Sequence, residues 1–127
     1  MGLDTTHDCW HGPYSSFKRF RDEVAVAAAE HYGYVPVYEG PSRVYYGWWD
    51  DDHPYSHILD VFFLHSDCGG WIFPRDAGSL ADALDPLIGY LADEPNMHRI
   101  HSSREKLRAF VAGLRSAAEE WQIVGFH

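Results

Sequence analysis

The chain is poor in cysteine and in long apolar segments. Its two cysteines, Cys9 and Cys68, are too few for a disulfide scaffold, and both lie among polar residues, which predicts free thiols. No apolar run approaches the roughly 20 residues that cross a bilayer. No basic segment followed by an apolar stretch opens the sequence, so we expect no signal peptide. These absences predict a cytoplasmic protein without a membrane partner.

Positive charge is also scarce. Nineteen Asp and Glu residues against ten Lys and Arg residues give a formal charge of −9 over 127 residues. A protein that coats nucleic acid needs a basic face for the phosphates, so we expect no nucleic-acid polymer as a partner. The 46% of hydrophobic residues is enough for one core. The length fits a single compact domain, residues 1–127.

Histidine and aromatic residues are abundant: the chain has nine His, five Trp, eight Tyr and seven Phe. Imidazoles and aromatic rings offer hydrogen-bonding groups and stacking faces, which suit a ligand pocket.

Helical periodicity and capping signals predict three helices. Apolar residues recur at helical spacing over 17–31, with Ser15 or Ser16 as the cap and Gly33 as the end. Capping-box patterns at 79–82 and 102–105 predict two further helix starts, and Pro86 should kink or divide the first of these helices.

Strand patterns lie between these helices. We expect strands at 2–6, two around a turn within 34–49, a central strand at Ile58–His65, a return strand at 71–73 and a closing strand at 122–126. The predicted fold is α/β (α+β), with about three helices packed on a mixed sheet.

The segment before the first helix is the first candidate site. Free amides at a helix start attract anions, hydroxyl and basic side chains add donors, and an aromatic ring can stack on a base. The candidate ligand-binding residues here are His7, Asp8, Trp10, His11, Tyr14, Ser15, Ser16 and Arg19. In the alternative interpretation, Asp4, Thr5 and Asp8 are turn and cap residues, while Trp10 and Tyr14 pack in the core.

The second candidate is the turn at 65–70, where His65, Asp67 and Cys68 follow the expected central strand. His65 could activate the Cys68 thiol, but two residues three apart rarely reach attack geometry, and a tight turn explains the segment equally well. We assign these three residues to the ligand site, together with His127.

Metal binding is the third candidate. On an extended chain His7, Cys9 and His11 would point the same way, and the 65–68 turn could complete a tetrahedral site. The sequence has no CxxC or HExxH pattern, however, so we expect a hydrogen-bonded histidine set, with no metal and no other cofactor.

Three motifs resemble a family of small proteins of actinobacteria and their phages. They are GLDTTHDCWHG with the following YSSF, then LHSDC, and the FH at the end. In that family an acid more often stands where this chain has Gly69 and Trp71. The resemblance implies a compact α/β domain and a phage origin, hence a location in the host cytoplasm; it implies no catalytic residue.

Three functions follow from these patterns. The leading one is a non-enzymatic protein that captures a small anionic, nucleotide-like ligand, which in a phage could sequester a host immune messenger. The second is a small hydrolase that uses His and Asp residues, with or without a metal. The third is a protein–protein inhibitor or immunity-type module, based on the acidic loop 50–52 and the aromatic residues at 44–49. A homo-oligomer is compatible with each.

Overall fold

A computed structural model describes residues 2–39, 43–48, 58–59, 62, 70–93 and 102–126 of the chain. Its helices are α1 (Tyr14–Tyr32), α3 (Pro74–Leu84) and α4 (Ser103–Glu120), with short 3-10 segments η1 (Thr6–Asp8) and η2 (Asp85–Tyr90). Its strands are β1 (Gly2–Asp4), β2 (His11–Pro13), β3 (Tyr34–Glu39), β4 (Arg43–Trp48), β5 (Trp71–Ile72) and β6 (Val124–Gly125). The predicted α+β class with about three helices is confirmed.

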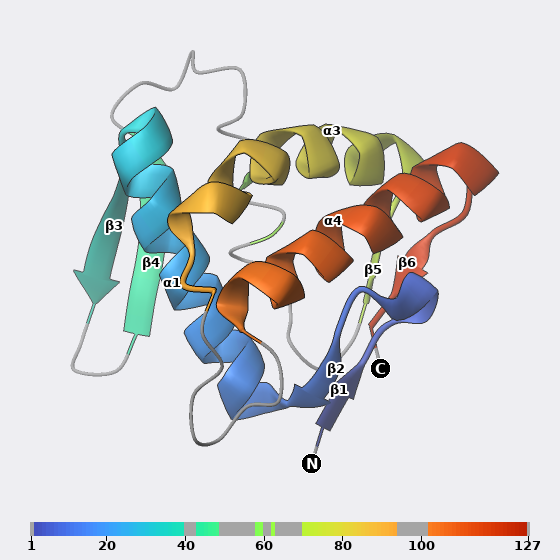
Figure 1. Cartoon of the computed structure of the whole chain (residues 1–127), viewed down its shortest axis with the longest axis horizontal. Coiled ribbons are helices and arrows are strands. Elements are labelled where there is room, and N and C mark those ends of the chain that lie inside the picture. Colours follow the sequence, from blue (N-terminus) through green and yellow to red (C-terminus); the bar gives the residue numbers. More distant parts are fainter. Residues whose placement is uncertain are drawn as a thin grey trace.

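The helices form the body of the molecule, and the strands lie around it. Helices α3 and α4 pack along each other, and α1 lies across their end with the β3–β4 hairpin on its outer side (Figure 1). The β1–β2 hairpin approaches α4 from below in this view, next to β6. No helix in the described part of the chain is long and apolar enough to cross a membrane.

An aromatic cluster joins α1 to α4. Phe17 and Phe20 of α1 are fully buried, and the Phe17 ring stacks on Phe110 of α4 with 6.3 Å between centroids. Phe62 meets Phe110 edge-on at 5.2 Å, and Trp10 stacks on Phe20 at 4.9 Å. Each buried ring contributes roughly 1.5–3 kcal/mol through the apolar surface it removes from water. These ring contacts connect the two long helices through the core.

The expected central strand at Ile58–His65 is wrong at every described position. Ile58, Leu59 and Phe62 are helical and buried. A short continuous apolar run fits a buried helix turn as well as a buried strand, and periodicity cannot separate the two. The remaining residues of that stretch lie outside the described ones.

The strands therefore pair without a common central strand. In the described ranges they form three separate two-stranded sheets, β1–β2, β3–β4 and β5–β6, all antiparallel, in place of the single mixed sheet that we expected. One isolated antiparallel bridge, Thr5 to Phe126, links the first of these sheets to the last. The predicted strands at both ends of the chain, the hairpin within 34–49 and the return strand after Gly70 are confirmed.

Two of the predicted helix boundaries are confirmed by their caps. Gly33 follows α1 with φ +79°, a conformation that glycine adopts at little cost, and its N–H donates to the Ala29 carbonyl. At the start of α4 the Ser102 hydroxyl accepts a hydrogen bond from the Glu105 N–H at 3.1 Å. The backbone freedom of Gly33 sets the end of α1, and the side chain of Ser102 sets the start of α4.

The capping box at 79–82 is wrong. Helix α3 begins at Pro74, whose fixed φ suits a first helical position. Ser79 therefore lies within the helix, where its hydroxyl donates to the Arg75 carbonyl one turn earlier. Pro86 acts as predicted, because α3 ends at Leu84 and the chain continues as η2.

The turn between β1 and β2 packs its backbone directly on α4. His7 and Asp8 have φ of 61° and 56°, as in a type I′ hairpin turn without glycine. The metal alternative required an extended segment over 7–11, and the turn at His7 and Asp8 does not provide one. Gly113 of α4 leaves room for the turn: a Cβ there would lie 2.5 Å from Cys9 Sγ and 2.6 Å from the His7 carbonyl oxygen.

We expect Gly113→Ala to destabilise the protein by about 2 kcal/mol or more, because the turn must move away from α4. Urea denaturation followed by circular dichroism measures the loss. Gly78→Ala is the matched control, since a Cβ at this other helical glycine meets only Ala118 Cβ at 3.5 Å. That control should be neutral or stabilising through helix propensity. Equal effects of the two substitutions would contradict the close contact.

Candidate functional site

The opening motif, the end of the chain at 125–126 and Gly70, which closes the 65–70 turn, meet at one place. Phe126 N–H donates to the Gly70 carbonyl at 2.9 Å, and Phe126 also bridges to Thr5. Gly125 N–H donates to Thr6 Oγ1 at 2.9 Å. The backbones of the opening motif, of Gly70 and of residues 125–126 are therefore neighbours. Of the predicted site residues, His65, Asp67, Cys68 and His127 lie outside the described ones.

His7 contacts the end of α4. Its Nδ1 lies 2.9 Å from Thr6 Oγ1 and its Nε2 lies 3.0 Å from Gln122 Oε1, while Glu120 Oε2 is 3.6 Å away. The side chain is only 13% exposed. These partners are distinct from those of His11, so the two histidines do not form one cluster.

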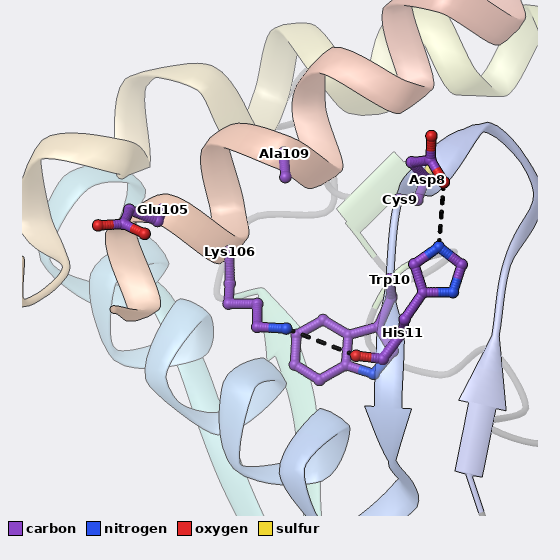
Figure 2. Close-up of a pocket in the computed structure, with 7 residues that line it drawn as sticks. All are labelled: Asp8, Cys9, Trp10, His11, Glu105, Lys106 and Ala109. Carbon is purple, nitrogen blue, oxygen red and sulfur yellow. Dashed lines mark hydrogen bonds and ion pairs between the residues drawn. The ribbon is translucent and has the colours of Figure 1, made fainter. Parts of the chain in front are cut away.

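A cavity of about 480 Å³ lies between the β1–β2 hairpin and α4 (Figure 2). Its lining residues are Asp8, Cys9, Trp10, His11, Glu105, Lys106 and Ala109. Pockets for small ligands commonly have volumes of about 300–1,000 Å³, so this one is large enough for a ligand of nucleotide size. Three of the predicted ligand-binding residues, Asp8, Trp10 and His11, are among the lining residues.

Trp10 is a wall of this cavity and part of the core. It is 3% exposed, with Phe20 stacked on it and Phe17 meeting it edge-on at 5.2 Å. Lys106 Nζ lies 4.6 Å from its ring centroid, a cation–π contact. Its buried Nε1–H has no acceptor among the described residues. Ring packing therefore holds Trp10, as the core alternative predicted.

His11 lies between two carboxylates at the mouth of the hairpin. Its Nδ1 is 2.8 Å from Asp4 Oδ1, its partner in the strand register, and its Nε2 is 3.1 Å from Asp8 Oδ1. A neutral imidazole has one N–H, so only the protonated ring donates to both carboxylates. Hydrogen bonds from Asp4, and then from Asp8, raise the pKa of His11 above its usual 6.5.

Cys9 is not arranged as a nucleophile. It is 1% exposed, and burial raises the pKa of its thiol to about 12, so the thiolate is not formed near neutral pH. The sulfur lies in the packing contact with α4 at Gly113. Among the residues that the structure describes, no three His, Cys, Asp or Glu side chains are placed to hold a metal ion.

The predicted residues in the first turns of α1 lie apart from the cavity lining. Ser16 is half-buried and Arg19 is exposed, and neither contributes to the cavity wall. Helix α1 begins at Tyr14, so Ser15 and Ser16 lie inside its first turn and the predicted cap at either serine is wrong. The side chains of Tyr14 and Ser15 are outside the described part of the structure. The cavity lining therefore comes from the 8–11 segment and α4, and it includes no residue of α1.

Three lining residues were not predicted: Glu105, Lys106 and Ala109. All three follow the cap at Ser102 and lie in the first two turns of α4. Lys106 also donates to the His11 carbonyl at 3.5 Å (Figure 2). The scarcity of lysine, with only Lys18 and Lys106 in the chain, was the one signal in the sequence that could have drawn attention to it.

No protein-family model matches this sequence, and neither the curated proteins nor the solved structures include a match to it. The resemblance to the actinobacterial and phage family stays a prediction, carried by its three motifs alone.

We expect the His11 imidazole to titrate above pH 6.5 in the folded protein. The titration midpoint should be lower in the Asp4→Asn variant, which lacks the carboxylate that contributes most to the raised pKa. Its stabilising contribution is complete below about pH 6.5 and is lost as the pH rises through the higher folded-state pKa. NMR chemical shifts of the ring protons give the midpoint. Asp82→Asn, which alters a carboxylate paired with Arg115, should leave it unchanged. A wild-type midpoint at or below 6.5 would contradict this arrangement.

Proposed function

We propose that this protein is a non-enzymatic binding protein that holds a small anionic ligand in the cavity between the β1–β2 hairpin and α4. The observation that carries the proposal is the convergence of Lys106 and His11 on one cavity of about 480 Å³. Lys106 reaches across Trp10 from α4, and His11 comes from β2. An anionic group there would accept a charge-assisted hydrogen bond from the Lys106 ammonium, while both ring nitrogens of His11 stay directed at Asp4 and Asp8.

The acidic residues of the same cavity narrow the class of ligand. Asp8 and Glu105 also line it, and the Asp8 side chain is 96% exposed. A simple anion would be repelled by these carboxylates, whereas a ligand with hydrogen-bond donors as well as an anionic group could use both kinds of residue. A nucleotide fits this description, because it joins a phosphate to ribose hydroxyls and base amino groups. A nucleotide-like ligand is therefore our proposal.

The structure changes how the base would be held. Stacking on Trp10 was the sequence-based expectation, but Phe20 packs on this ring and the ammonium of Lys106 lies over it. The base would replace Lys106 on the indole while the ammonium turns to the phosphate. Trp10 then serves as a fixed floor, set by the core before any ligand arrives.

Binding without catalysis is supported by the state of His11. A general base needs a lone pair that faces its substrate, whereas both ring nitrogens of His11 face the carboxylates of Asp4 and Asp8. His7 has its own partners at the end of α4. The hydrolase and the protein-inhibitor interpretations stay predictions, since residues on which they depend, such as His65 and Asp67 or the 50–52 loop, lie outside the described residues.

The test compares Lys106→Gln with Arg108→Gln, an exposed cation of α4 outside the cavity. Equilibrium dialysis would use AMP, ADP-ribose, a cyclic dinucleotide and inorganic phosphate as probes. We expect the wild type to retain at least one nucleotide, and Lys106→Gln to weaken it about 10-fold or more, because a charge-assisted hydrogen bond is lost. Arg108→Gln should change the affinity less than about 2-fold.

The proposal fails if the intact protein retains no probe, or if both variants lose affinity equally. Recovery of a cleaved nucleotide from the dialysis chamber would favour the hydrolase instead. Trp10→Ala is unsuitable for this test: removing a buried ring of the core costs about 3–5 kcal/mol and would confuse lost binding with lost folding.

A further inference from the structure

A second surface, away from the cavity lining, exposes large apolar side chains. Trp71 is 56% exposed, Phe73 54%, Ile123 48% and Trp121 70%. We call these four residues the β5–β6 patch. Trp71, Phe73 and Ile123 belong to or directly adjoin two paired strands, whereas Trp121 directly follows α4, and none of the four lines the cavity.

The strand register places these side chains on one face. Trp71 pairs with Gly125 and Ile72 with Val124, while Phe73 directly follows β5 and Ile123 directly precedes β6. Ile72 and Val124 are fully buried, whereas Trp71, Phe73 and Ile123 alternate with them and point outward. Trp121, two residues before Ile123, extends the patch toward the end of α4.

The patch rests on a fixed support. Beyond its pairing with β5, the β6 segment bonds to the N-terminal hairpin through Gly125 N–H to Thr6 Oγ1 and through the Thr5–Phe126 bridge. Trp121 is held by the helix end: its φ is 53°, and the Gln122 N–H closes the last turn onto the Ala117 carbonyl at 2.9 Å. Rigid exposed aromatic residues of this kind are the usual anchors of protein interfaces.

We propose that the β5–β6 patch docks a basic polypeptide segment. Glu119 and Glu120, both exposed, come directly before Trp121 in the last turn of α4. Carboxylates next to indole faces suit arginine and lysine, which pair with the former and stack on the latter. The net charge of −9 would attract such a partner over longer distances.

A second copy of this chain fits the patch less well. Four side chains that are about half to two-thirds exposed offer roughly 400–500 Å² in total, against about 800 Å² per partner in a standard stable interface. Two copies, each with a net charge of −9, would also repel each other, and a symmetric contact through the patch would bring Glu119 and Glu120 of both copies close together. Size and charge therefore favour a short basic partner over self-association.

The experiment measures fluorescence anisotropy of a labelled 12-residue peptide of alternating arginine and leucine, with a glutamate–leucine peptide for comparison. We expect the wild type to bind the arginine peptide at least 10-fold more tightly than the glutamate peptide. Trp121→Ser and Phe73→Ser should each weaken binding of the arginine peptide 5-fold or more. Glu119→Gln should also weaken it while leaving intact the apolar face and the contact between Glu120 and His7. Val26→Ser is the matched control: Val26 is 58% exposed on α1 and outside the patch, so its change should be less than 2-fold.

Two results would overturn the proposal. One is that Val26→Ser and Trp121→Ser weaken binding of the arginine peptide equally, or that neither weakens it. Either outcome would mean that the peptide binds by general charge attraction. The other is a dimer in analytical ultracentrifugation that Trp121→Ser dissociates, which would make a second copy the occupant. Circular dichroism checks that each variant is folded.

Discussion

The contact between the hairpin turn and α4 at Gly113 is the constraint on which the cavity depends. With no Cβ at this position, the turn backbone lies against the helix, and Cys9 enters the core. The next residue, Trp10, then reaches Phe20, and the one after it, His11, faces outward to its carboxylates. If the turn lay farther from α4, Lys106 would lose both the indole and the His11 carbonyl that now position it.

The turn between β1 and β2 has an unfavourable backbone conformation at His7 and Asp8. Two consecutive residues without the freedom of glycine adopt left-handed backbone conformations, at roughly 1 kcal/mol or more each. Aspartate and histidine tolerate that region better than most residues, and burial of Cys9 and Trp10 offsets the cost. The same turn presents Asp8 to the cavity. Core packing thus maintains a surface conformation that the local sequence would not favour by itself.

Features set by near neighbours were predictable, and those set by distant contacts were not. Gly33 and Ser102 end and begin helices through groups within one turn, so their signals could be read directly. The run from Ile58 onward carries no such signal, and only the surrounding core decides that its described residues are helical. Likewise the 8–11 segment was recognised as a candidate site, while Lys106, 95 residues from His11, was missed because no local pattern brings the two together. Trp10 was ambiguous for the same reason: an indole suits a ligand or a core, and Phe20 decides for the core.

The bonds that join the two ends of the described chain also have a consequence for its synthesis. Thr6 lies 119 positions before Gly125, its hydrogen-bond donor, and Thr5 bridges to Phe126. The ribosome therefore synthesises the β1–β2 hairpin long before residues 124–126. Helix α4, whose Gly113 contacts the turn of this hairpin, is synthesised only shortly before those residues. Among the described elements, the hairpin that forms the cavity therefore precedes its own supports along the chain, and its full set of contacts requires closure of a loop of more than 100 residues.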